Sequence, residues 1–229
     1  MNNFFANPEG AWGDGSVHLT TIGIAIVVAV IALLLVSAAV IRHKKATKKA
    51  ALTTKQLVYS AVAIALAVVC SMIKLYEMPM GGSVTLLSML FIVLIAYWYG
   101  PYVGIMTAVA YGLVQFVMEP IFYTIPQMLF DYPLAFGALG IAGFFNKKKY
   151  GLQIGYVAGV LGRFIFATIS GVIFFASYAP EGMHPLVYSI GYQASYLVPE
   201  TIVTLIILCI PSVSHALALV KKQAVEQSS

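Results

Sequence analysis

Charged residues are scarce in this chain. They make up 9% of its 229 residues, while hydrophobic residues make up 61%. A soluble domain usually carries about 25% charged residues, so this composition excludes a soluble fold. Because about 20 apolar residues span a bilayer, the long apolar runs instead indicate a polytopic membrane protein.

Reactive side chains are sparse as well. The only two cysteines, Cys70 and Cys209, fall inside apolar runs, so we expect neither a disulfide nor a metal cluster. The sequence contains no HExxH, GxSxG or phosphate-loop motif. We therefore expect no enzyme activity, no catalytic residue, no metal, no cofactor and no nucleic-acid partner.

The apolar runs predict seven transmembrane helices. The expected fold class is an all-α integral membrane protein in which a six-helix core, 56–212, follows one extra N-terminal transmembrane helix, 19–41. Residues 1–18 are then an extracellular segment, 42–55 a basic cytoplasmic linker and 213–229 a cytoplasmic tail. The predicted spans are 19–41, 56–75, 84–99, 102–118, 127–145, 153–176 and 187–212.

The basic residues predict the orientation in the membrane. All of the 13 Lys and Arg residues except Lys74 and Arg163 fall in segments that seven spans place on one side. The positive-inside rule makes that side cytoplasmic, with the N-terminus outside and the C-terminus inside. Most acidic residues fall on the outer side, which favours a cationic solute there. The first 18 residues carry no Lys or Arg, so the first span is read as a retained anchor and not as a cleaved signal.

One carboxylate, Asp131, stands at the outer start of the span 127–145. A carboxylate at a membrane edge is costly unless a positive group pairs with it, and few cations lie on that side. Gln127 and Tyr123 precede Asp131 by four and eight residues, so a helix brings all three to one face. An acceptor, an amide and a ring suit a flat nitrogen heterocycle. The alternative is a carboxylate that interacts with the helix N-terminal dipole.

Two further charges lie near the middle of the predicted membrane. Gln193, Tyr196 and Glu200 share one stripe of the last span, and Arg163 reaches a similar depth on the preceding span. A charge at the bilayer centre costs about 2.5–3.5 kcal/mol. We therefore predict an Arg163–Glu200 ion pair, with direct contact between Glu200 and a ligand as the alternative.

Small residues form two other candidate features. Ala61 and Ala65 are four apart in the span 56–75, which gives a small face for close helix contact, either within the protein or with a membrane partner. Gly82 and Ser83 precede the span 84–99. They predict either a turn that leads into a serine N-cap or a backbone that a ligand can approach closely.

Four segments carry a resemblance to a known family. MPMGGSVTLL, PQMLFDYPLAFGALGIAGFF, LGRFIFATISGVIFFASYAPEG and PLVYSIGYQASYLVP resemble the thiamine-specific substrate-binding (S) components of energy-coupling factor transporters, the ThiT/YuaJ family, over about 56–212. The resemblance implies a component that binds its vitamin on the outer side and docks on a membrane coupling subunit driven by two cytoplasmic ATPase subunits. The implied function is thiamine uptake. The alternatives are an S component for a thiamine precursor or other cationic heterocycle, and a stand-alone membrane receptor or sensor.

The resemblance also implies roles for single residues. Asp131-Tyr132 matches the family's acid–tyrosine pair, in which the acid faces the thiazolium cation and the ring stacks on it. Gly82 stands beside Ser83 where family members carry Trp, so that aromatic wall is absent. Further matches are Tyr188, Gln193 at a family amide, Phe175 at a family aromatic, and Ala61 and Ala65 on the docking face.

Two positions depart from the family pattern. Ala167 stands where the family has a histidine that hydrogen-bonds the pyrimidine, and Glu200 lies outside the pattern. Loss of a hydrogen-bond partner costs about 1–3 kcal/mol. We expect Gln193 or Glu200 to compensate if thiamine is the ligand.

Overall fold

The computed structural model describes residues 6–7, 18–19, 52–78, 82–121 and 123–226. The predicted extra span, apart from Leu19, and linker residues 42–51 lie outside the described part of the chain. The elements are β1 (Ala6–Asn7), β2 (His18–Leu19), α2 (Thr54–Met72), β3 (Lys74–Glu77), β4 (Ser83–Thr85), α3 (Ser88–Tyr99), α4 (Pro101–Met118), α5 (Ile125–Leu129), η1 (Phe130–Leu134), α6 (Ala135–Gly137), η2 (Ala138–Phe145), α7 (Gly151–Phe174), η3 (Ala176–Tyr178), α8 (Pro185–Cys209) and α9 (Pro211–Glu226).

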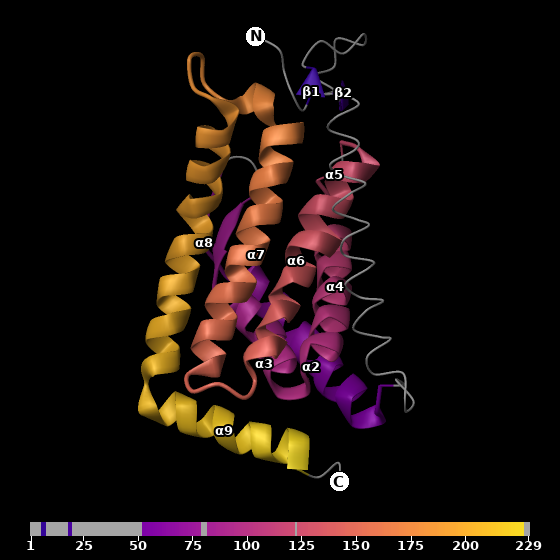
Figure 1. Cartoon of the computed structure of the whole chain (residues 1–229), viewed down its shortest axis with the longest axis vertical. Helices are drawn as coiled ribbons and strands as arrows, with labels where there is room; N and C mark the ends of the chain where they lie inside the picture. Colours follow the sequence, from indigo (N-terminus) through magenta and orange to yellow (C-terminus); the bar gives the residue numbers. More distant parts are fainter. Residues whose placement is uncertain (1–5, 8–17, 20–51, 79–81, 122, 227–229) are drawn as a thin grey trace.

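The described helices form an upright bundle (Figure 1). Five of them are long and apolar enough to cross a membrane: α2, α4, the composite helix Ile125–Phe145, α7 and α8. Helix α3 is also apolar but shorter. The prediction of an all-α, multi-pass membrane protein is confirmed, and the composite helix is the most buried of the five.

A short hairpin replaces part of two predicted spans. The spans 56–75 and 84–99 are too long, because α2 ends at Met72 and α3 begins at Ser88. Between them β3 pairs with β4 in antiparallel fashion, with Glu77 opposite Ser83. The N-cap of α3 is Leu87, so the prediction of a Ser83 N-cap is wrong. The charged Lys74 and Glu77 are unsuited to an apolar helix, which favours the hairpin.

Pro133 divides the composite helix. Proline has no N–H, and its ring displaces the carbonyl four residues earlier, which here is that of Leu129. The regular helix α5 therefore ends at Leu129. The chain widens into the π-helical turn η1, where the Ala135 N–H donates to the Phe130 carbonyl. Such turns often occur at functional sites. Here η1 presents Asp131 and Tyr132 to the bundle interior.

Glycines allow the composite helix to pack closely on its neighbours. A Cβ added at Gly140 would lie 2.5 Å from the Ile105 backbone nitrogen, whereas nothing lies within 4 Å of one added at Gly191. We predict that Gly140→Ala lowers stability by about 1–3 kcal/mol, the usual cost of overpacking. Gly191→Ala is the matched control. Thermal unfolding in detergent checks this, and equal midpoints for the two variants would contradict it.

Apart from Lys74 and Arg163, the basic residues of the described chain gather at one end of the bundle, where α9 occupies most of the predicted tail 213–229. The span 187–212 ends early, at Cys209, and α9 then crosses beneath the bundle (Figure 1). Lys55 Nζ donates to the Gln223 carbonyl at 2.5 Å and the Tyr99 hydroxyl to the Ala224 carbonyl at 3.1 Å. Lys221 lies 4.1 Å from the centre of the Tyr97 ring. This basic end lies opposite the loop residues 119–121, 123–124 and 175–184, which form the loop end.

Candidate functional site

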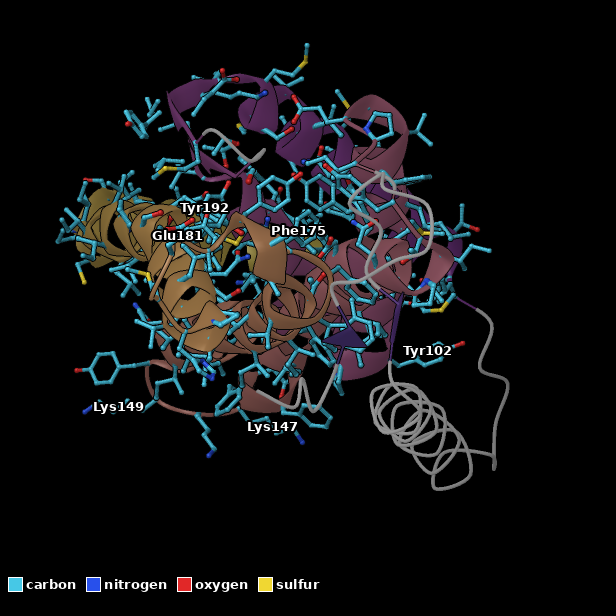
Figure 2. All side chains as sticks on the ribbon, turned by 90° about the horizontal axis from the view of Figure 1, so that it is seen from above. Tyr102, Lys147, Lys149, Phe175, Glu181 and Tyr192 are labelled. Carbon is cyan, nitrogen blue, oxygen red and sulfur yellow. The ribbon has the colours of Figure 1, made fainter. Side chains whose placement is uncertain are left out.

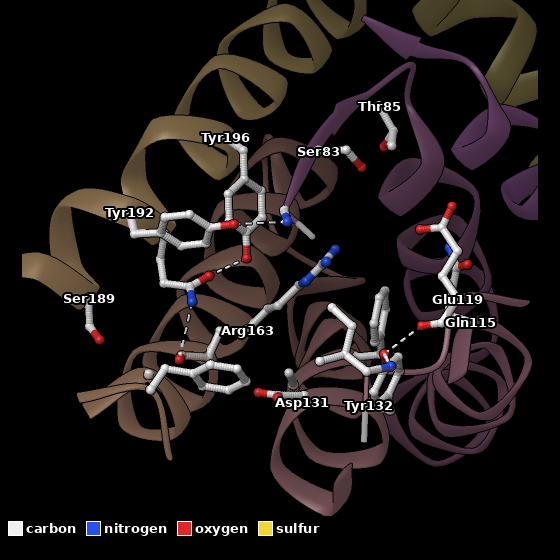
Figure 3. Close-up of a pocket in the computed structure, with 18 of the residues that line it drawn as sticks. Ser83, Thr85, Gln115, Glu119, Asp131, Tyr132, Arg163, Ser189, Tyr192 and Tyr196 are labelled. Carbon is white, nitrogen blue, oxygen red and sulfur yellow. Dashed lines mark hydrogen bonds between the residues drawn. The ribbon is translucent and has the colours of Figure 1, made fainter. Parts of the chain in front are cut away.

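A cavity of about 390 Å³ extends from the loop end into the bundle. Its wall is built from the β3–β4 hairpin, the end of α4, η1, α7 and α8 (Figure 3). Seen from the loop end, Phe175 and Tyr192 lie toward the middle of the bundle, while Lys147 and Lys149 lie at its edge (Figure 2). The residues that line the cavity include loop residues at its mouth and charged residues from the membrane-spanning helices.

Eight of the ten predicted ligand-binding residues line this cavity. They are Gly82, Ser83, Asp131, Tyr132, Phe175, Tyr188, Gln193 and Glu200. Gln127 and Tyr123 are not among the lining residues. The helical spacing that grouped Gln127 with Asp131 is correct. Tyr123 precedes the helix, whose N-cap is Thr124, so the prediction that a helix brings it to the same face is wrong. Gln127 lies behind the wall, and the exposed Tyr123 lies at its rim.

Gln127 holds Asp131 in position. Its side chain is fully buried, and Nε2 donates to Asp131 Oδ2 at 2.5 Å and to the Ile121 carbonyl at 3.1 Å. Its Oε1 accepts from the Tyr123 backbone N–H at 3.0 Å. The amide thus fixes the carboxylate and the preceding loop together.

The mouth is joined across loops by aromatic and charged contacts. The Tyr123 and Tyr178 hydroxyls hydrogen-bond at 3.1 Å, and this bond and partial burial raise the pKa of Tyr123. Lys74 on β3 lies 2.5 Å from Glu119 and 2.8 Å from Glu77. Hydrogen bonds to Glu119 and Glu77 raise the pKa of Lys74. The hairpin is thereby ion-paired to the end of α4.

Tyr132 forms part of the cavity wall and anchors the loop above it. Its hydroxyl donates to the Glu119 carbonyl at 2.7 Å and accepts from the Ile121 N–H at 2.9 Å. Its ring meets Phe116 edge-on at 5.0 Å. A ring fixed in this way offers a rigid surface on which a flat ligand can stack.

Two tyrosines of α8 fill the space beside Gly82. The Gly82 N–H donates to the Tyr192 hydroxyl at 3.0 Å. A Cβ at Gly82 would lie 2.8 Å from the Tyr196 ring. A tryptophan therefore does not fit at this position, and Tyr192 and Tyr196 supply the aromatic wall instead. Tyr192 has no signal in the sequence, while the stripe shared with Gln193 and Glu200 pointed to Tyr196.

Gln193 occupies part of the region opposite Ala167. Its Nε2 donates to the Ala167 carbonyl at 3.3 Å, and its Oε1 accepts from the Tyr196 hydroxyl. Both ends of this amide are therefore engaged by the protein. Gln193 has limited capacity left to replace a missing histidine.

The predicted Arg163–Glu200 ion pair is wrong. The ion pairs of the described residues do not include it. Glu200 accepts from the Thr85 N–H at 3.2 Å, the Thr85 hydroxyl at 2.9 Å and the Ser88 hydroxyl at 3.2 Å. The Arg163 guanidinium lies 4.1 Å from the centre of the Phe136 ring. Both charged groups line the cavity, but β4 and α3 supply the hydrogen-bond partners of Glu200.

Two other sequence predictions concern reactive residues and the docking face. Within the described ranges, no three His, Cys, Asp or Glu residues are placed to hold a metal. Cys70 and Cys209 are free thiols. Ala61 and Ala65 are exposed, whereas Ala63 and Ala67 pack inside the bundle. The small face of α2 therefore points outward and does not serve packing between the described helices.

Comparisons with known proteins agree on one family. The family model described as "Thiamine transporter protein (Thia_YuaJ)" matches residues 57–219. Thiamine transporter ThiT of Bacillus subtilis (strain 168) is 37% identical over 167 residues, which is 67% of this chain and 85% of that protein. Thiamine transporter ThiT of Lacticaseibacillus paracasei is 27% identical over 94 residues, 35% of this chain and 47% of that protein. A solved structure of ThiT from Listeria monocytogenes is similar in fold, with a TM-score of 0.58, 22% identity, and coverage of 69% of this chain and 96% of that chain.

Proposed function

Because the chain belongs to the thiamine transporter protein (Thia_YuaJ) family, we propose that it is the thiamine-binding S component of an energy-coupling factor transporter. Its task is to bind the vitamin in the membrane, and the proposal assigns it no catalytic residue. The small-molecule ligand occupies the cavity between η1, α7 and α8.

The observation that carries this proposal is the charge balance of the cavity. Asp131, Glu200 and Arg163 line it without forming ion pairs to one another or to other described residues. Glu119 also lines it, but it lies at the mouth and is ion-paired to Lys74, which it shares with Glu77. With both carboxylates ionised, the three unpaired groups leave one negative charge. The thiazolium ring of thiamine carries one positive charge and would neutralise it.

The ligand's rings also find suitable surfaces. Tyr132 and Tyr196 line the cavity and are only 8% and 7% exposed, so the surrounding helices hold the orientation of their rings. Aromatic faces attract cations, and Asp131 stands beside Tyr132. We place the thiazolium between this pair, as the resemblance implied.

We further propose that the loop end faces outward. Lys55, Lys147–149 and Lys221–222 lie at the opposite end, and the positive-inside rule places such clusters in the cytoplasm. This puts the C-terminus in the cytoplasm and the cavity mouth outside. The exposed Ala61–Ala65 face then lies along α2 within the bilayer, where we place the coupling subunit, which two cytoplasmic ATPase subunits drive.

Calorimetry on the purified full chain tests the ligand assignment. We expect thiamine to bind with a dissociation constant well below about 1 μM, a binding free energy beyond about −8 kcal/mol. The uncharged aminopyrimidine half of thiamine and the non-aromatic cation choline are the controls, and both should bind far more weakly. Tight binding of the uncharged half together with thiamine binding weaker than micromolar would replace thiamine by a precursor, which Ala167 makes the second candidate.

A further inference from the structure

Arg163 presents unused hydrogen-bond donors to the cavity. A guanidinium has five N–H donors, yet within the described ranges its contact is with the face of the Phe136 ring, and no carboxylate there pairs with it. Figure 3 shows its head group pointing into the cavity. A charged group at this depth in the membrane is costly unless it serves a ligand or another polar group.

Glu200 presents a complementary acceptor. Its side chain is only 2% exposed. Thr85 engages Oε2 through both its backbone N–H and its hydroxyl, whereas Oε1 is contacted only by the Ser88 hydroxyl at 3.2 Å. A carboxylate has about four lone-pair sites, so Oε1 keeps capacity for one more donor. The two bonds from Thr85 hold the carboxylate in a fixed orientation.

Arg163 and Glu200 both lie deeper in the bundle than Ala167, the position at which the family has a histidine. Arg163 precedes Ala167 by four residues on α7, so it lies on the same helix face about 6 Å deeper. Glu200 lies on the cavity stripe of α8, about 10 Å deeper than Gln193. Gln193 already bonds Ala167 and Tyr196, and the buried Thr168 hydroxyl has no hydrogen-bond partner among the described residues. The charged groups deeper on α7 and α8 are Arg163 and Glu200, which keep unused donors and acceptors.

We propose that Arg163 and Glu200 together recognise the edge of the ligand's neutral aminopyrimidine ring. The guanidinium donates to a ring nitrogen, and Glu200 Oε1 accepts from the exocyclic amine. This inference rests on the proposed function and names the groups that replace the histidine contact. It also orients the ligand, because the cationic thiazolium is attracted to Asp131 and repelled by Arg163.

Thiamine and oxythiamine provide the test. Oxythiamine carries oxygen in place of the exocyclic amine, so this edge presents an acceptor where thiamine presents a donor, and the ring nitrogen becomes a donor. The unmodified protein should bind oxythiamine at least about tenfold more weakly than thiamine, the effect of one mispaired buried group. In Glu200→Gln the amide can donate to the oxygen. Thiamine binding should weaken about tenfold or more, and the ratio of the two dissociation constants should fall toward about one to three.

The controls separate this inference from the function on which it rests. Glu181→Gln makes the same change at an exposed loop residue and should keep the original ratio. An equal loss for both ligands in Glu200→Gln would make Glu200 a packing residue and overturn the inference. Failure of the unmodified protein to bind thiamine would instead overturn the proposed function.

A second variant covers the case in which Glu200→Gln does not fold. Arg163→Lys keeps the charge but loses the planar fork of donors. It should weaken thiamine binding about tenfold. Binding of thiamine's uncharged thiazole half, which lacks the aminopyrimidine, should weaken less than threefold. Unchanged thiamine affinity in this variant, or no discrimination between thiamine and oxythiamine by the unmodified protein, would overturn the inference.

Discussion

Thiamine is expected to bind Asp131→Asn about 30-fold to several-thousandfold more weakly than the unmodified protein. Truncating one partner of a buried charge pair costs about 2–5 kcal/mol, because the remaining charge is left without compensation. Here the substitution also removes the net negative charge that Asp131, Glu200 and Arg163 leave in the cavity. A monocation would then enter a site with no electrostatic preference for it.

The substitution should leave the fold intact. Asparagine has nearly the volume of aspartate, and its Oδ1 can still accept the bond that Gln127 Nε2 donates at 2.5 Å. Calorimetry gives the affinity, and the midpoint of thermal unfolding without ligand checks the fold. The uncharged aminopyrimidine half of thiamine should bind both proteins alike. If Asp131→Asn bound thiamine as tightly as the unmodified protein, Asp131 would have only a structural role.

The site was largely predictable where its residues are close in sequence. Helical spacing placed Gln127 four residues before Asp131, and the two side chains do hydrogen-bond. The stripe formed by Gln193, Tyr196 and Glu200 likewise faces the cavity. Such patterns depend only on the helical period, so they survive errors in helix boundaries.

The parts that could not be predicted depend on contacts distant in sequence. Thr85 and Ser88 precede Glu200 by 115 and 112 residues. Thr85 was predicted to lie in the helix 84–99 but lies in strand β4. The depths predicted for Arg163 and Glu200 in the membrane did not show in which direction each side chain points around the axis of its helix. The π-helical turn at Pro133 was also missed, because an apolar proline-containing run does not show whether the helix kinks, widens or ends.

The departure at Gly82 illustrates how structure changes the meaning of a sequence difference. From sequence, glycine in place of tryptophan removes an aromatic wall. In the fold, Tyr196 lies 2.8 Å from the position of a Cβ at Gly82, and Tyr192 accepts the Gly82 N–H. The aromatic surface is therefore retained but comes from α8, which a comparison made position by position does not detect.

Replacing both small residues of the α2 face, Ala61→Leu with Ala65→Leu, is expected to reduce thiamine uptake strongly while leaving thiamine binding unchanged. Both alanines are exposed and are absent from the cavity lining, so added bulk does not reach the ligand. A small-xxx-small face lets another helix approach closely. Overpacking costs about 1–3 kcal/mol at each site, so uptake should fall by roughly 30-fold or more if both alanines contact a partner helix.

Uptake of labelled thiamine by cells that also produce the coupling subunit and its ATPases measures the effect, and co-purification of those subunits shows whether docking is lost. Gly191→Leu is the matched control, because it adds bulk at an exposed small residue of α8 with nothing within 4 Å of the new Cβ. That variant should transport normally. Normal uptake by the double variant would mean that this face contacts only lipid, and the partner would then have to dock on another surface. Loss of both binding and uptake would instead show that the alanines support the fold. A docking face that is separate from the cavity acts after the vitamin is bound, so a defect in docking alone leaves binding intact.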